Sequence, residues 1–309
     1  MLRLQVMSSW PELDPEQDHD TFAVLHLASQ MLGKVRVAHS TWENHGWNST
    51  LRPAANGLST LPTAAPNGRS FSLTLDLCAH GIALTVSDGT HDLVPFAGQT
   101  VAEVHEALLA MLDRHALPSS FHSKPNEVEN AVRFADDTAP RRYDVDSARR
   151  LLGALAAVVP VFDRFRAGFA GKASPVHFFW GSFDLAVTRF SGREAPPHPG
   201  GIPGLPDRIT REAYSHEVSS AGFWPGGVMA AAPIFYSYAY PEPEGFRNAR
   251  VAHGKFDEAL GEFTMPYAEV RTSADAAGIL TEFLQSTYVA AADLARWHRA
   301  ALEREPVAP

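Results

Sequence analysis

Hydrophobic and polar residues alternate with a period of two in the first half of the chain. The alternation covers residues 71–79 and returns at residues 82–86. Because successive side chains of a strand point to opposite faces, it predicts strands with one buried and one solvent-facing side. The segment Ser87-Asp88-Gly89-Thr90 is typical of a hairpin turn, and residues 93–96 continue the pattern. We therefore expect an antiparallel meander.

Helical spacing flanks this meander. Apolar residues recur three and four positions apart over residues 20–32, and the pair Gly33-Lys34 predicts the end of that helix. Thr100 and Glu103 have the spacing of a capping box, which predicts the start of another helix.

The second half repeats this order. An Ala- and Leu-rich segment, residues 145–169, predicts a helix that Pro160 kinks or breaks and that ends before Gly171-Lys172. The segment Thr272-Ser273-Ala274-Asp275 predicts the cap of a final helix. Between these helices, strands are expected at residues 183–188, 214–223, 234–240 and 263–267.

The whole pattern predicts an α+β fold of two related halves, residues 1–140 and 141–309, each an antiparallel sheet packed by helices. Both halves contain a helix, a Gly-Lys pair, a histidine near a tryptophan (His45 and His177), several strands and a final helix. Internal duplication explains this order, and so does coincidence.

Composition limits the class of protein. The 309 residues are 45% hydrophobic, which is enough for one large core or two ordinary ones. The longest apolar stretch, residues 151–162, is too short to cross a bilayer, so no membrane partner is expected. The net charge of −9, without a Lys/Arg stripe, argues against nucleic acid as a partner.

Cysteine content and the first residues predict a compartment. Cys78 is the single cysteine, so an internal disulfide is excluded, as is usual in a reducing compartment. Residues 1–20 are acidic and lack a sustained apolar core, unlike a secretory leader. Both observations favour the cytoplasm.

Residues 191–207 are rich in proline and glycine and are expected to form a loop. Long irregular segments inside a compact domain are usually lids or disordered insertions. Since this segment follows an aromatic strand directly, we consider a lid over a binding site.

The segment 172–185 interleaves bulky aromatic residues with ionisable ones and is the best candidate for a pocket wall. No phosphate loop, nucleophile elbow, zinc cage or dinucleotide fingerprint is present. The sequence therefore identifies neither a reaction nor a cofactor.

Four ionisable residues embedded in apolar sequence are candidate catalytic groups: His177, Asp184, His216 and Glu217. A buried charge costs several kcal/mol unless it is paired, and a pocket is one way to supply partners. The alternative is an internal salt bridge of Asp184 with Arg189 or Arg211.

These groups allow different chemistries. A histidine with a carboxylate partner titrates in a useful range, and Ser182 or Ser215 is a candidate nucleophile. A metal site is not predicted, because adjacent His216 and Glu217 would point to opposite faces of a strand. Candidate ligand-binding residues are Trp180, Ser182, Arg189, Tyr214, Trp224 and His45.

Two further patterns have a structural and a functional interpretation. The segment Tyr236-Ser237-Tyr238-Ala239-Tyr240 places three phenols on one semi-polar face, which suits a cleft as well as a sheet core. Lys34 and Lys172 each follow a glycine at an expected helix end, where they interact with the helix dipole or bind a substrate.

A family resemblance rests on the segments Leu25-His26-Leu27, Gly33-Lys34-Val35-Arg36, Asn44-His45-Gly46-Trp47, 174–193, 211–217 and 222–227. With these segments, the chain resembles the uncharacterised bacterial domain-of-unknown-function family 5996. The family usually has another aromatic residue where Gly46 stands here. The resemblance implies a bacterial protein and no activity, cofactor or catalytic residue.

Two hypotheses follow. The first is a small-molecule pocket in residues 141–309, either catalytic or purely binding. The second is a structural or partner-binding protein whose aromatic segments form the core or a subunit interface. The sequence leaves homo-oligomers and the choice between enzyme and binder open.

Overall fold

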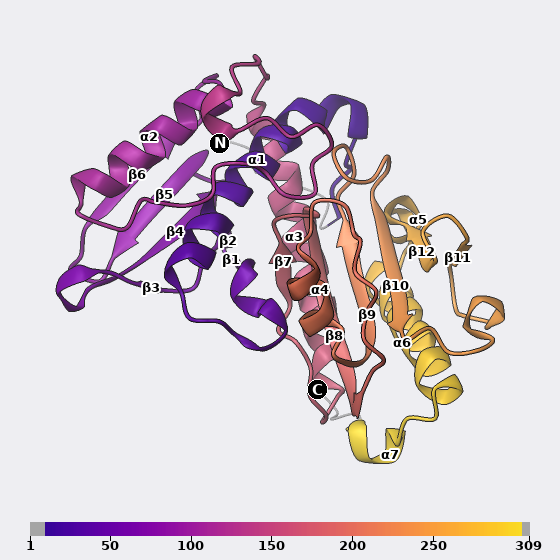
Figure 1. Cartoon of the computed structure of the whole chain (residues 1–309). Helices are drawn as coiled ribbons and strands as arrows, with labels where there is room; N and C mark the ends of the chain where they lie inside the picture. The colour runs from indigo at the N-terminus through magenta and orange to yellow at the C-terminus, as the bar shows by residue number, and fades with distance from the viewer. Residues whose placement is uncertain (1–9, 305–309) are drawn as a thin grey trace.

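The structure is a computed structural model that describes residues 10–304. Within this range, one twelve-stranded antiparallel sheet runs through the molecule, with helices on its faces (Figure 1). The predicted α+β class is confirmed. The strands follow the order β11-β12-β10-β9-β8-β7-β1-β2-β4-β5-β6, and β3 pairs with β4.

The strands of the first half are β1 (Thr50–Ala54), β2 (Gly57–Ser59), β3 (Thr63–Ala64), β4 (Ser70–Asp76), β5 (Gly81–Val86) and β6 (His91–Pro95). Those of the second half are β7 (His177–Phe179), β8 (Asp184–Glu194), β9 (His216–Trp224), β10 (Ile234–Tyr240), β11 (Lys255–Asp257) and β12 (Glu262–Pro266). The predicted meander is confirmed, since β4, β5 and β6 pair antiparallel in sequence order.

The helices are α1 (Pro15–His39), α2 (Val101–Arg114), α3 (Val145–Ala167), α4 (Asp207–Ala213), α5 (Tyr267–Thr272), α6 (Ala276–Leu294) and α7 (Arg299–Leu302). Short 3₁₀ helices are η1 (Asn44–Ser49), η2 (Pro66–Gly68), η3 (Phe134–Asp136) and η4 (Phe246–Asn248). The capping box of Thr100 and Glu103 is present at the start of α2.

The predicted end of α1 is wrong, and α3 does not break at Pro160. Helix α1 continues through Gly33 to His39, because the buried residues around Gly33 hold the helix against the core. Helix α3 continues through Pro160, which is exposed, so water can solvate the carbonyl group left without a donor. It ends at Ala167, before Gly171.

The predicted boundaries of two other segments also change. Strand β8 extends to Glu194 and includes the start of the Pro/Gly-rich segment, so the irregular part covers residues 195–206 before α4. Asp275, the last residue of the predicted cap, caps α6 by accepting a hydrogen bond from the Gly278 N–H.

The two faces of the second-half sheet differ in character. Leu185, Val187, Phe223, Phe235 and Met265 are buried on one face, and α3 and α6 lie behind the sheet in Figure 1. The other face lies under α4, in front of the sheet in the same view. That second face contains the candidate site.

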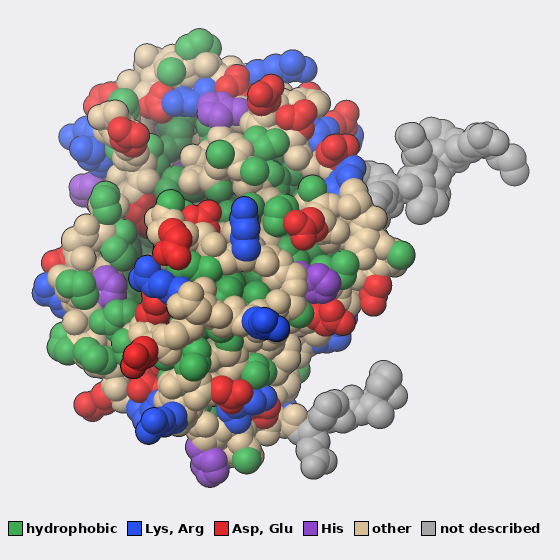
Figure 2. Space-filling view, turned by 90° about the vertical axis from the view of Figure 1, so that its right-hand side faces the viewer, with side chains coloured by type: hydrophobic (Ala, Val, Ile, Leu, Met, Phe, Trp, Pro, Cys, Tyr) green, Lys and Arg blue, Asp and Glu red, His purple; other side chains and the backbone are tan. Residues whose placement is uncertain are grey.

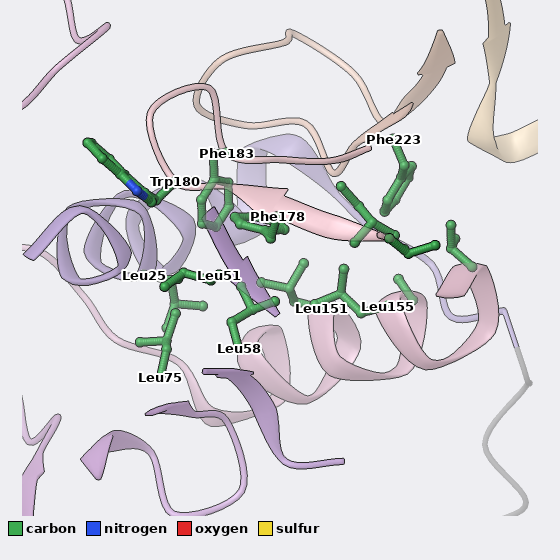
Figure 3. Packing of buried hydrophobic residues seen from close by; sticks show 14 of the residues in the cluster. Leu25, Leu51, Leu58, Leu75, Leu151, Leu155, Phe178, Trp180, Phe183 and Phe223 are labelled. Atoms are coloured by element: carbon green, nitrogen blue, oxygen red, sulfur yellow. The ribbon is translucent and has the colours of Figure 1, made fainter. Parts of the chain in front are cut away.

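The two halves share one hydrophobic core. The sheet continues between them because Thr50 and Leu51 of β1 pair with Phe179 and Phe178 of β7. In Figure 3, Leu25 of α1, Leu51, Phe178 and Leu151 of α3 converge from both halves. Each half has a long helix, a meander and a further helix. Internal duplication and the division at residue 140 stay predictions.

The surface of the described chain is mixed in character. The face shown in Figure 2 mixes acidic, basic and hydrophobic side chains. Over residues 10–304, every helix is too short or too polar to traverse a bilayer.

Candidate functional site

A cavity of about 650 Å³ lies on the second face of the sheet. Its floor is formed by β7, β8, β9, β10 and Glu262 of β12. Residues 202–214, which include part of the Pro/Gly-rich segment and α4, line its outer side. The remaining walls come from the end of α1, from η1 and from the segment around Glu127. The cavity thus collects residues from both halves.

Small residues at the centre of the sheet create this hollow. Ala186 of β8 pairs with Gly222 of β9, and Thr188 pairs with Ser220 in the neighbouring row. The Tyr236 ring of β10 lies across Gly222, where a Cβ atom would overlap the ring. Gly222 thus makes room for the Tyr236 ring, and the short side chains of Ala186, Thr188 and Ser220 leave space above the sheet for a ligand.

The hairpin between β7 and β8 forms one wall. Trp180 is 8% exposed, lines the cavity and lies directly on Gly33 of α1, where a Cβ atom would overlap the indole. Figure 3 shows Trp180 beside this helix. Phe183 adopts a left-handed conformation (φ 53°) and is fully buried. Such a conformation is strained for an aromatic residue, and its packing holds it in place.

The irregular segment that contains Asn126 and Glu127, called the strap below, connects α1 to the outer wall. The Gln30 side chain accepts a hydrogen bond from the Asn126 N–H (2.7 Å) and donates one to the Asn126 carbonyl (2.8 Å). The Lys34 ammonium donates to Asn126 Oδ1, and Asn126 Nδ2 donates to the Gly204 carbonyl (2.7 Å). The strap therefore fixes the Pro/Gly-rich segment over the cavity.

Asp184 lies at the floor of the cavity and is 3% exposed. Its carboxylate accepts hydrogen bonds from Ser182 Oγ (2.5 Å) and from the Tyr236 hydroxyl. Burial raises the pKa of Asp184 to about 6, and these two donors limit the rise.

Two further carboxyl groups face the same cavity. Burial, together with the charge of Asp184, raises the pKa of Glu127 to about 7. The same causes, together with the charge of Asp257, raise the pKa of Glu262 to about 8. Glu262 Oε2 is buried and has no hydrogen-bond partner among residues 10–304. The carboxyl groups of Asp184, Glu127 and Glu262 therefore titrate near neutral pH.

Lys34 is the buried cation of the site and is 6% exposed. Burial lowers the pKa of its ammonium group to about 8. Its nitrogen lies 5.4 Å from the centre of the Trp180 ring. Helix α1 continues past this residue, so Lys34 does not interact with a helix end.

Hydroxyl groups form two hydrogen-bonded pairs in the cavity lining. The Tyr214 and Tyr238 hydroxyls are 2.8 Å apart, and the Thr188 and Ser220 hydroxyls are 2.9 Å apart. Burial raises the pKa of Tyr214 to about 12, so this phenol stays protonated at neutral pH. These groups can both donate and accept hydrogen bonds.

His45 closes the far wall. Its Nδ1 donates to the Glu212 carbonyl (3.0 Å), and its Nε2 accepts from Lys172 Nζ (2.6 Å). Burial, followed by the Lys172 charge, lowers the pKa of His45. It is therefore a neutral imidazole at pH 7.

The comparisons with known proteins assign a family. The model of a family of unknown function (DUF5996) matches residues 10–304. The chain belongs to this family. Searches among curated proteins and among solved structures find no match. The resemblance inferred from sequence is confirmed, and membership in DUF5996 adds no activity to the site.

The DUF5996 chain brings six of the ten predicted site residues to the cavity. Asp184 is the one predicted catalytic residue among them. The five predicted ligand-binding residues that line the cavity are Trp180, Ser182, Tyr214, Trp224 and His45. Trp224 Nε1 donates to the Ser182 carbonyl (3.1 Å), so both are fixed beside Asp184.

The other four predicted residues lie outside the cavity lining. His177 is 0% exposed beneath Trp47 and Phe179, and burial lowers its pKa to about 3. His216 bonds to Ser215 beside His45 and does not line the cavity.

Arg189 and Glu217 lie on the opposite face of the sheet. The Arg189 guanidinium donates to the Phe165 carbonyl and lies 3.5 Å from the Phe165 ring centre. Because it faces the helices, it forms no salt bridge with Asp184. Glu217 pairs with Arg193 (2.6 Å). His216 and Glu217 therefore diverge, as the strand pattern predicts.

Sequence reasoning missed Asn126, Glu127 and Glu262. Glu262 occupies an alternate position of a strand, two residues before Thr264, which pairs with Tyr236. This alternate spacing indicates that Glu262 and Thr264 share one face of the sheet, so the sequence could have identified Glu262. Asn126 and Glu127 lie in an irregular segment, where no periodicity indicates which way a side chain points. Within residues 10–304, no three His, Cys, Asp or Glu side chains form a metal-binding group.

The strap supports a testable expectation. Asn126→Ala removes the partner of the buried Lys34 ammonium and the bond to Gly204, so we expect the free energy of unfolding to fall by about 1–3 kcal/mol. Limited proteolysis should cut residues 195–206 faster. Gln17→Ala, an exposed amide truncation on α1, is the control and should change neither measurement. Equal proteolysis of both variants would contradict the role of the strap.

Proposed function

We propose that the cavity is the binding site of a small organic molecule. The observation that carries this proposal is a hollow of about 650 Å³ into which buried ionisable groups from both halves of the chain converge. Small-molecule sites usually occupy about 300–1,000 Å³, with apolar walls and a few fixed polar groups. Binding is the step that a carrier and an enzyme share.

The electrostatics of the walls support a functional site. Carboxyl and ammonium groups with shifted pKa values gather preferentially at functional sites, and Asp184, Glu127, Glu262 and Lys34 all face this cavity. A purely structural core would avoid the cost of desolvating them.

The position of the aromatic residues favours a pocket over a subunit interface. An interface needs its rings on the outer surface, whereas Trp180 is buried and Trp224 is half-buried beside Asp184. Cys78, the single cysteine, is exposed, and its lack of an internal partner supports a role in a reducing bacterial cytoplasm.

A ligand screen tests this proposal. Thermal-shift measurements against a metabolite library are expected to give compounds that raise the melting temperature of the wild-type protein. Ala213→Trp places an indole at the cavity wall and should abolish these shifts. Ala301→Trp, on the exposed α7, is the matched control and should keep them. Compounds that stabilise both variants equally would place binding elsewhere and contradict the proposal.

A further inference from the structure

The cavity has an excess of acidic groups. Asp184, Glu127 and Glu262 face it from β8, from the strap and from β12. No basic side chain is among the causes that shift the pKa of any of them. Lys34 is occupied by Asn126, and Arg208 is exposed at the rim, beside the Trp42 ring. The site therefore offers acidic groups that form no ion pair with a basic residue of the described chain.

A second, independent observation is unsatisfied hydrogen-bonding capacity. Glu262 Oε2 is buried without a partner in residues 10–304. The Thr210 hydroxyl, on a fully buried residue of α4 that lines the cavity, also has none there. Buried polar atoms without partners cost free energy. A ligand that donates hydrogen bonds to Glu262 Oε2 and the Thr210 hydroxyl would therefore bind more favourably, because it removes this cost.

The aromatic faces beside the carboxyl groups suit a cation. The Trp224 and Tyr236 rings lie 4.4 Å apart, and the Tyr236 and Tyr238 rings stack at 6.2 Å with an interplanar angle of 15°. The faces of such rings attract positive charge, most strongly where water is excluded. Glu262 lies beside this stack, because Ser237 of β10 pairs with Phe263 of β12 and the next residues along the two strands are Tyr238 and Glu262.

The opposite wall is apolar. Val37 and Ala38 of α1 and Ile202, Leu205 and Ile209 of the covering segment line it. This wall can contact a hydrocarbon or aromatic body but supplies no polar partner for one.

We propose that the ligand is an organic amine with an apolar body. Its ammonium group lies among the carboxyl groups of Asp184, Glu127 and Glu262 and donates to at least one of them, over the faces of Trp224 and Tyr236, and its body lies against the apolar wall. This inference rests on the proposed function. A single metal ion fits less well, because within residues 10–304 no three of these acidic groups converge on one coordination point.

Binding of an amine to this site should depend on pH. Without a cation, burial and mutual repulsion favour the protonated carboxyl groups near neutral pH. An ammonium group favours the ionised form, so binding releases protons and affinity rises from pH 6 to pH 8. Other titratable or charged groups that face the cavity are Lys34, His45, His122, Arg208, Tyr214, Tyr236 and Tyr238. Lys34, whose lowered pKa is about 8, loses its competing charge over the upper end of this range.

The test uses three probes of the same size and different charge. Tryptamine is a cation, tryptophol is neutral, and indole-3-acetate is an anion. Isothermal titration calorimetry should show tryptamine binding most tightly, with an affinity that increases between pH 6 and pH 8. Titrations at pH 7 in two buffers of different ionisation enthalpy should show that protons are released.

Variants locate the cation. Glu262→Gln and Asp184→Asn should each weaken tryptamine binding about 10- to 100-fold, as expected for loss of a charged hydrogen-bond acceptor. Glu217→Gln changes a carboxyl group on the opposite face and is the matched control. Its affinity for tryptamine should equal that of the wild-type protein.

Other outcomes separate the inference from the proposed function. Tighter binding of indole-3-acetate, with affinity falling as pH rises, would show that protonated carboxyl groups donate to an anion. Equal binding of all three probes, lost in Ala213→Trp, would also overturn the amine while leaving the small-molecule site in place. If no probe binds, the amine inference fails, and the metabolite screen decides the proposed function separately.

Discussion

Gly33→Ala is expected to lower the free energy of unfolding by about 1–3 kcal/mol. At an ordinary position inside a helix, the same change stabilises by up to about 1 kcal/mol. Here the new methyl group would overlap the Trp180 indole, so either the hairpin or α1 must shift. Chemical denaturation of both proteins measures the difference.

A double-mutant cycle isolates this contact. Trp180→Ala opens space over Gly33, so Gly33→Ala should be neutral or stabilising in that background. Measuring Gly33→Ala in the Trp180→Ala background separates the clash with the indole from a general effect of the substitution on the helix. A stabilising effect of Gly33→Ala in the wild-type background would contradict the close approach of α1 to the site wall.

Glu262→Gln is expected to stabilise the protein increasingly as pH rises. The pKa of Glu262 in the folded protein, about 8, lies above its ordinary value, so the folded state keeps a proton that the unfolded state has lost. Wild-type stability from this group therefore falls as pH increases toward 8. The variant should gain about 1.4 kcal/mol relative to the wild type between pH 6 and pH 7, and less per pH unit as the pH approaches the pKa of about 8.

When the variant and the wild type are compared at each pH, the contributions of other titrating groups to stability cancel. Buried His177 and Lys34, whose pKa values are lowered, add pH dependence to both proteins alike. Glu217→Gln is the control, and its stability relative to the wild type should not grow over this range. A constant difference between Glu262→Gln and the wild type would show that Glu262 is not desolvated as the structure places it.

The sequence predicted those parts of the fold in which the side-chain period decides burial. The alternation at residues 71–86 gave β4 and β5, and residues 234–240 gave β10 with its three tyrosines on one face. The helix end at Gly33 was predicted wrongly and a break at Pro160 does not occur, because tertiary packing in α1 and solvent exposure in α3 outweigh local propensity.

The candidate site was predictable only in part, for a physical reason. Trp180, Ser182 and Asp184 follow one another in sequence, and the chemistry of a short hairpin can be read directly. The small residues that open the cavity, Ala186 and Ser220, have meaning only once β8 and β9 pair. Glu127 reaches the site through the strap and its long-range contacts with α1, which leave no local pattern.

A crystal structure of the protein soaked with tryptamine at pH 8 tests the central claim most directly. The account predicts the ammonium nitrogen within about 3 Å of a carboxylate oxygen of Asp184, Glu127 or Glu262, with the indole against Ile202, Leu205 and Ile209. An amine bound only outside the cavity, or a cavity filled by protein side chains, would contradict it.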